Sequence, residues 1–155
     1  MFIAHLPAAY IAFKAGARRI SKPAFAAGML GAVFPDLDMF WFYFIDHKAH
    51  HHHDYITHRP FVWICITVIG FALYRYRCSA VVTAFGVGGL IHMLLDTTLG
   101  AVNWAWPFGD WGGPVIIVPA THDHWIASFV THWTFWPEII ICVVAAIVYA
   151  RSRRT

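Results

Sequence analysis

Charged side chains are too scarce in this chain to cover the surface of a soluble domain. They make up 12% of the 155 residues, whereas hydrophobic residues make up 59%, and soluble domains usually carry about twice this share of charge. The apolar residues are concentrated in five segments, at positions 2–13, 23–45, 60–74, 79–102 and 125–150. The second, fourth and fifth reach the roughly 20 residues that a helix needs to cross a bilayer, while the third is short and the first is shorter still. The sequence therefore predicts an all-α, polytopic transmembrane helical bundle with about five membrane segments.

The length of the chain indicates one membrane-embedded domain over residues 1–155. Acids or histidines interrupt the longer apolar segments, so no uncharged run reaches spanning length. A compact soluble helical protein is therefore the alternative fold class, and the scarcity of charge argues against it.

The basic residues predict how the bundle is oriented. They gather at three places, which are Lys14 with Arg18, Arg19 and Lys22, then Arg75 with Arg77, and finally Arg151 with Arg153 and Arg154. The positive-inside rule makes these places cytoplasmic. All eight acids fall in the opposite half or in its loops. We therefore expect a multi-pass membrane protein with a cytoplasmic C-terminus and a polar site on the opposite, outer side.

Ionisable side chains of four segments are expected at one depth in the bilayer. At a rise of ~1.5 Å per residue, His5, Asp36, His92 and Glu138 each lie about 20–22 Å from the nearest cytoplasmic anchor. Ionisable groups in an apolar environment need a compensating partner, and a bound metal ion is a common one. This agreement in depth predicts a metal site near the outer side of the hydrocarbon.

Two pairs of residues are the first candidates for metal ligands. His92 and Asp96 are spaced i, i+4, which places both side chains on one face of a helix; a simple His–Asp hydrogen bond is the alternative. Asp36 and Asp38 follow Pro35 inside an apolar segment. Positions two apart point to nearly opposite sides of a helix, so Asp36 is preferred over Asp38 unless the chain opens after the proline. In the alternative interpretation, the aspartates cap a helix that begins there.

Histidines of the second connection complete the candidate site. His47, the run at positions 50–53 and His58 lie there, and neutral imidazole together with carboxylates suits zinc or iron. We expect His53 and His58 to act as ligands or as a general acid and base, and other histidines of the run to orient ligands or carry protons. Arg59 could pair with a substrate phosphate, or alternatively with Asp54. His5 is an additional candidate ligand. In the alternative interpretation, it is a buried histidine that makes its hydrogen bonds within the protein core.

An aromatic-rich outer loop separates the fourth and fifth segments. Six of the eight tryptophans lie between positions 104 and 136, as expected for an interfacial belt. The part at 107–119 is expected to form a loop or a re-entrant lid over the metal site, and a plain outer loop that rests among lipid headgroups is the alternative.

These motifs resemble the YdjM-like family of predicted membrane-bound metal-dependent hydrolases. The resemblance depends on His5, on Gly28-x-x-Gly31-x-x-x-Pro35-Asp36-x-Asp38, on His53-x-x-x-Thr57-His58, and on His92-x-x-x-Asp96 followed by Gly100, and it covers the chain to about residue 119. The family is in turn similar to zinc-dependent phospholipases C and single-strand nucleases. The resemblance implies metal ligands at His5, Asp36, His58, His92 and Asp96, with His53 or Asp38 in addition. One departure is that His132 and Glu138 are six residues apart, where those enzymes have a His-x-x-x-Glu pair.

Together with this resemblance, the sequence predicts a membrane-bound metal-dependent hydrolase of the bacterial inner membrane, with its site facing the periplasm and with one to three divalent ions, two zinc ions being favoured. The expected substrate is a phosphoester, in a lipid headgroup that reaches the site sideways or in a similar small molecule. No basic tract with interleaved aromatic residues is present, so no nucleic-acid partner is expected. The alternatives are a non-catalytic metal-binding or metal-delivery membrane protein and a structural membrane protein whose histidines and acids simply pair.

Overall fold

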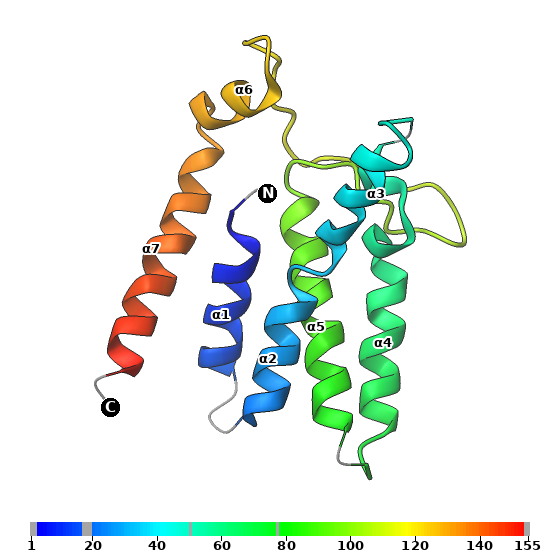
Figure 1. Cartoon of the computed structure of the whole chain (residues 1–155), viewed down its shortest axis with the longest axis vertical. Helices are drawn as coiled ribbons and strands as arrows, with labels where there is room; N and C mark the ends of the chain where they lie inside the picture. Colours follow the sequence, from blue (N-terminus) through cyan, green and yellow to red (C-terminus); the bar gives the residue numbers. More distant parts are fainter. Residues whose placement is uncertain (1–2, 17–19, 50, 77, 154–155) are drawn as a thin grey trace.

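The computed structural model describes residues 3–16, 20–49, 51–76 and 78–153, and over these residues the chain is helical with no β-strand. Seven α-helices run in the order α1 (His5–Gly16), α2 (Lys22–Gly31), α3 (Asp38–Phe44), α4 (Pro60–Ala72), α5 (Ser79–Asp96), α6 (Trp125–Thr131) and α7 (Phe135–Ser152). Three short 3-10 helices, η1 (Pro35–Leu37), η2 (His52–Asp54) and η3 (Ile56–His58), lie in the connections. The long helices run roughly side by side, and most connections with irregular structure gather at one end (Figure 1). The predicted all-α class is confirmed.

The helices provide fewer candidate membrane spans than the five predicted. Within the described residues, α5 and α7 are long and apolar enough to cross a bilayer, and α2 together with Pro35–Phe44 counts as a third span if the bent pair is taken as one. The first and third apolar segments are helical, but α1 has 12 residues and α4 has 13. These lengths are below the roughly 20 residues of a full crossing, so two or three spans are supported.

Helix α5 forms the centre of the bundle, with α2 packed on one side and α4 on the other. Glycines allow this close approach. A Cβ atom on Gly31 would lie 2.1 Å from the carbonyl oxygen of Phe85, and one on Gly88 would lie 2.1 Å from the carbonyl oxygen of Gly28. Backbone cannot yield to such contacts, and small residues at helix interfaces are the usual solution inside membranes. The Gly28-x-x-Gly31 motif is therefore part of the packing between α2 and α5.

The chain breaks between α2 and α3 at Pro35. Proline has no N–H group to continue the hydrogen-bonding ladder of a helix, and here it begins η1, after which Asp38 begins α3. The segment Pro35–Phe44 is bent by 51° from α2. The expected continuous segment at 23–45 is thus two helices. Opening the helix changes the directions of Asp36 and Asp38, so that both carboxylates reach the histidine cluster described below.

The last apolar segment is also divided, into α6 and α7. Residues 132–134 separate the two helices, and the Nδ1 atom of His132 lies 2.8 Å from the Oγ1 atom of Thr134 at this junction. The preceding loop is tied to the end of α5 because the backbone N–H groups of Val115 and Ile116 donate to the carbonyl oxygens of Thr97 and Thr98. Residues of α6 and residues at the C-terminal end of α5 line one cavity, which is described below.

Candidate metal centre

The carboxylate of Asp96, at the C-terminal end of α5, is surrounded by imidazole rings from several elements. Its Oδ1 atom lies 2.9 Å from Nε2 of His5. Its Oδ2 atom lies 3.0 Å from Nε2 of His92, 3.5 Å from Nε2 of His58 and 3.7 Å from Nε2 of His53. Both oxygens of one buried carboxylate therefore face imidazole nitrogens that belong to α1, α5, η2 and η3.

Asp36 closes the other side of this cluster. Its Oδ1 atom lies 3.6 Å from Nε2 of His92 and its Oδ2 atom lies 3.9 Å from Nδ1 of His5. The rings of His5 and His92 stack with centroids 3.8 Å apart. The carboxylate of Asp36 is partly open to the outside, because 45% of its side chain is exposed while the side chain of Asp96 is 4% exposed. One edge of the cluster is thus accessible to a ligand.

Three overlapping sets of donor atoms have the spacing needed to hold an ion. They are His5 with His92 and Asp96, then Asp36 with His58 and His92, and finally His52 with His53 and His58; within each set the donor atoms lie within 4.8 Å of one another. The first and third sets share no residue. Two ions could therefore be held together without sharing a ligand.

The hydrogen bonds of the buried histidines leave nitrogen atoms facing the cluster. The Nδ1 atom of His92 donates to the carbonyl oxygen of Ala32 at 2.8 Å, which leaves the lone pair of Nε2 for another partner. Among the described residues, Nε2 of His92, Nε2 of His58 and Nδ1 of His53 are buried and have no hydrogen-bond partner. A metal ligand needs such a lone pair, and a backbone carbonyl on the opposite ring nitrogen is a common support for it. The donor set therefore fits a divalent ion such as zinc or iron.

Asp38 supports the cluster from behind His58. Its Oδ2 atom lies 2.5 Å from Nδ1 of His58 and accepts a hydrogen bond from the hydroxyl of Thr57 at 2.6 Å. It belongs to none of the three donor sets formed by the described residues. This differs from the expectation that Asp38 is a candidate ligand, and the reason is that α3 begins at Asp38 and directs its carboxylate toward the far side of the imidazole. A carboxylate in this position fixes the ring orientation of a ligating histidine.

The protonation of the connection histidines follows from their neighbours. Burial lowers the pKa of His53 to about 2 and that of His52 to about 4, and in both rings neighbouring histidines add to this effect. Burial acts in the same direction on His58, but the carboxylates of Asp38 and Asp96 outweigh it and raise its pKa to about 9. His52 and His53 are thus neutral at pH 7, as metal ligands must be, and binding of a metal at His58 would release a proton.

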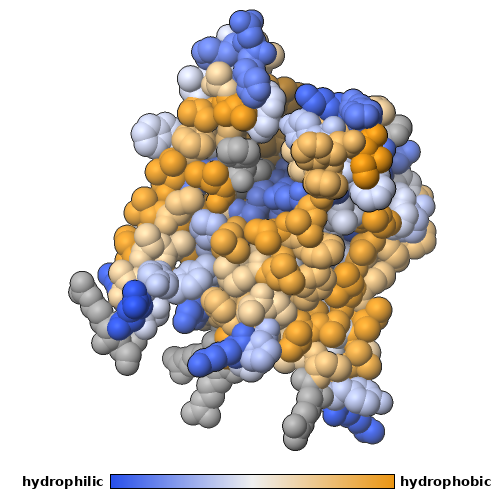
Figure 2. All heavy atoms as spheres, viewed as in Figure 1, coloured by the Kyte–Doolittle hydropathy of each residue, from blue (hydrophilic) through white to orange (hydrophobic). Residues whose placement is uncertain are grey.

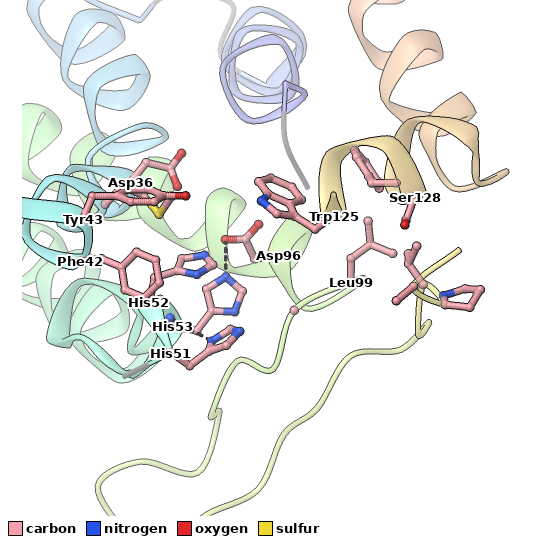
Figure 3. A pocket seen from close by; sticks show the side chains of 16 residues that line it. Asp36, Phe42, Tyr43, His51, His52, His53, Asp96, Leu99, Trp125 and Ser128 are labelled. Carbon is pink, nitrogen blue, oxygen red and sulfur yellow. Dashed lines mark hydrogen bonds and ion pairs between the residues drawn. The ribbon is translucent and has the colours of Figure 1, made fainter. Parts of the chain in front are cut away.

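A cavity of about 570 Å³ adjoins the cluster. Asp36, Asp96 and the histidines at 51–53 line one side of it, and residues of α3, α6 and the segment at 118–120 line the others. Figure 3 shows these polar side chains grouped on one side of the cavity, with Leu99, Trp125 and Ser128 on the other. The expected lid at 107–119 thus reaches the cavity only at Val118 and Pro119 among the lining residues, and α6 takes the larger part of that role.

Comparison with known proteins agrees with this membrane-embedded arrangement. A model of the YdjM inner membrane protein family matches residues 1–154. The chain belongs to this family. No curated protein matches the chain, and no solved structure matches it. Membership of an inner-membrane protein family, together with the apolar helices, favours the predicted membrane protein over the alternative of a compact soluble helical protein.

The structure brings together most of the residues that the sequence predicted for a site in this YdjM-family chain. His5, Asp36, His53, His58, His92 and Asp96 all belong to the cluster. The predicted depth of Glu138 does not make it a member of any donor set, because its Oε2 atom instead accepts a hydrogen bond from the backbone N–H of Ile3 at 2.6 Å. His50 and four of the basic residues that predicted the orientation, Arg18, Arg19, Arg77 and Arg154, lie outside the described residues.

Arg59 does not take the predicted catalytic position in this YdjM-family protein. Its Nη2 atom donates to the carbonyl oxygen of Asp54 at 2.8 Å and lies 3.6 Å from the Oδ1 atom of the same residue. Arg59 is not among the residues that line the cavity. The alternative prediction, pairing with Asp54, is the one that the geometry supports, since the short turn of η2 and η3 holds the two residues close together.

Two contributors to the site were missed by sequence reasoning. His52 was one of several equivalent histidines in a run, so no spacing distinguished it, yet it joins a donor set with His53 and His58. Gly100 was noted only as part of a motif. A Cβ atom at this position would lie 2.0 Å from Cε1 of His53, so the glycine leaves the room that the imidazole occupies.

Proposed function

We propose that this protein is a membrane-bound, metal-dependent hydrolase that cleaves a phosphoester at the periplasmic face of the bacterial inner membrane. The observation that carries the proposal is a group of buried imidazole rings around Asp96, next to a cavity, in which three ring nitrogens of the described residues have no hydrogen-bond partner. A buried ionisable cluster in an apolar bundle is costly unless it is compensated. Zinc is the ion that this mixed nitrogen and oxygen donor set favours, and the two disjoint donor sets favour two ions.

The direction of the site is supported by the distribution of charge along the helices. Lys14 lies in the last turn of α1, Lys22 begins α2, and Arg151 lies in the last turn of α7. The cluster lies at the N-terminal end of α1 and the C-terminal end of α5, far from these basic ends (Figure 1). Under the positive-inside rule the basic ends and the C-terminus are cytoplasmic, which directs the cluster to the periplasm.

The proposed reaction is hydrolysis of a phosphorus–oxygen ester bond. A divalent metal, when bound, lowers the pKa of a water molecule and polarises the phosphoryl oxygen. His5, Asp36, His58, His92 and Asp96 would hold the ions, and Asp38 keeps the His58 ring in position. His53 borders the cavity and is neutral at pH 7, which favours the role of a further ligand over that of a base, because a ring with a pKa of about 2 takes up a proton poorly. The water oxygen bonds to phosphorus, the ester bond breaks, and the leaving alcohol takes up a proton.

The second candidate function is non-catalytic metal binding or delivery. The observation in its favour is that His51 and His52 also line the cavity, as capture sites for ions would. Delivery across the membrane would need polar groups toward the cytoplasmic ends of the helices. In the middle of α5, between that end and the cluster, Gly86, Gly88 and Gly89 instead pack tightly against neighbouring helices.

Metal content and turnover together test the proposal. Detergent-purified wild type is expected to retain zinc, and Asp96→Asn to lose most of it, by elemental analysis. Phosphate or alcohol release from phosphoesters should fall to background in His92→Ala. His122→Ala, which removes an exposed histidine outside the donor sets, is the matched control and should behave as wild type. Equal, low metal in wild type and Asp96→Asn would overturn the metal site, whereas retained metal without turnover would favour the delivery function.

A further inference from the structure

The cavity beside the metal centre has one polar side and several apolar walls. The polar side consists of Asp36, Asp96 and the neighbouring histidines, while Met39 and Phe42 of α3 and Phe129 of α6 supply apolar wall. Leu99, at the end of α5, adds to it. A ligand that fills this space must offer a polar group to the cluster and an apolar part to the walls. Such division is typical of a site for an amphipathic molecule.

Basic side chains are missing from the lining. Among the residues that line the cavity in the described part of the chain, none is lysine or arginine. Sites for water-soluble phosphates commonly use arginine forks or lysines to bind the anion. In this cavity the charge of a phosphate would be neutralised at the metal centre. The rest of the ligand would then contact the apolar walls of the cavity.

The two helices that form the walls carry exposed aromatic residues. Trp41 and Phe44 on α3 are 52% and 68% exposed, and Trp125 on α6 is 53% exposed. Trp133, just after α6, is 58% exposed. Tryptophan gathers where headgroups meet acyl chains, so α3 and α6 are placed at the level of lipid phosphates. Figure 2 shows a polar hollow in this flank of the molecule with hydrophobic surface around it.

We infer that the substrate is a membrane phospholipid, which enters from the side between α3 and α6. Its phosphoester lies against the cluster of Asp36, His53 and Asp96, and its acyl chains leave along Met39, Phe42 and Phe129 toward the surrounding lipid. This inference rests on the proposed hydrolysis and assigns its substrate class. A water-soluble phosphoester would make the polar contacts but leave the apolar walls without a partner.

A substitution that narrows the cavity without touching the metal ligands tests the inference. Ala120 is exposed and lines the cavity, so Ala120→Trp should obstruct the space for the lipid. The ratio of turnover on phosphatidylethanolamine–phosphatidylglycerol vesicles to turnover on a soluble aryl phosphodiester should fall about tenfold or more. Ala101→Trp, at an exposed alanine outside the lining, should leave the ratio at the wild-type value. An unchanged ratio in Ala120→Trp would overturn the inference.

A binding measurement separates this inference from the proposed hydrolysis. Phosphatidylethanolamine with a photoreactive acyl chain is added to the His92→Ala protein, so that no turnover is needed. Crosslinks are expected in peptides that contain residues 39–43 or 125–129, and they should be lost when Ala120→Trp is added. Crosslinks without turnover in wild type would support the lipid site while the hydrolase proposal fails. Crosslinks spread evenly over the flank of α7 would overturn the lipid site, whatever the activity.

Discussion

Helices α5 and α7 look alike in sequence but have different places in the molecule. Both have 18 residues, with mean hydropathies of 1.5 and 1.6 over the spanning window, yet 39% of that window is buried in α5 and 6% in α7. Helix α5 lies between α2 and α4 and carries His92 and Asp96. Helix α7 packs mainly on α1 and carries Glu138. Hydropathy indicates that a helix can cross a membrane, whereas glycines and ionisable residues decide whether it is the centre of the bundle.

The largest difference between the two helices is expected from a bulky substitution. Gly88→Leu should strongly destabilise the protein, because the added Cβ atom meets the backbone of Gly28, and overpacking costs about 1–3 kcal/mol or more. The midpoint of thermal unfolding should fall by about 5 °C or more. Ala150→Leu, at an exposed position of α7, is the control and should unfold near the wild-type temperature. Similar shifts in both variants would remove the distinction between a central and a peripheral helix.

A smaller change just beyond α5 should act on the metal centre and leave the fold intact. Gly100→Ala directs a methyl group at the ring of His53, so the imidazole must move. Disturbing the support of a ligand typically weakens metal affinity about 10–100-fold. Competition with a chromophoric chelator measures this loss. Gly113→Ala adds the same methyl group where no atom lies within 4 Å, and it should keep wild-type affinity. Equal affinities in the two variants would show that His53 is not a ligand.

The smallest effect is expected from the carboxylate of α7. Glu138→Gln keeps an acceptor for the N–H group of Ile3 but removes its charge, and a charge-assisted hydrogen bond is roughly twice as strong as a neutral one. The unfolding midpoint should fall by about 2–4 °C, and metal affinity should fall less than in Gly100→Ala. Asp123→Asn, at an exposed acid, is the control. If Glu138→Gln abolishes metal binding as completely as His5→Ala, α7 supplies a ligand and the comparison with α5 fails.

Much of the fold was predictable because apolar segments and basic clusters carry simple signals. All five segments contain helices, and the position of α5 follows the fourth segment closely. The break at Pro35 was predicted only as an alternative, and the division at 132–134 was not predicted, since the hydrophobic pattern continues through both. The number of spans was overpredicted because α1 and α4 are helical without reaching spanning length.

The site was predictable where spacing and depth agreed. His92 and Asp96 share a helix face, and the depth estimate correctly indicated that His5 and Asp36 lie near them. Spacing alone could not show which side of an imidazole a carboxylate contacts, so Asp38 was placed among the ligands. It also could not decide between two partners of Arg59, because that choice depends on the fold of the short turn that contains Asp54.

The order in which the donors occur along the chain has a consequence for biosynthesis. Every residue of the three donor sets lies between His5 and Asp96, and α6 and α7 follow them. The nascent polypeptide therefore possesses its full complement of ion-binding side chains while its last helices are still to be translated. The wall that α6 contributes to the cavity is therefore synthesised after every residue of the three donor sets.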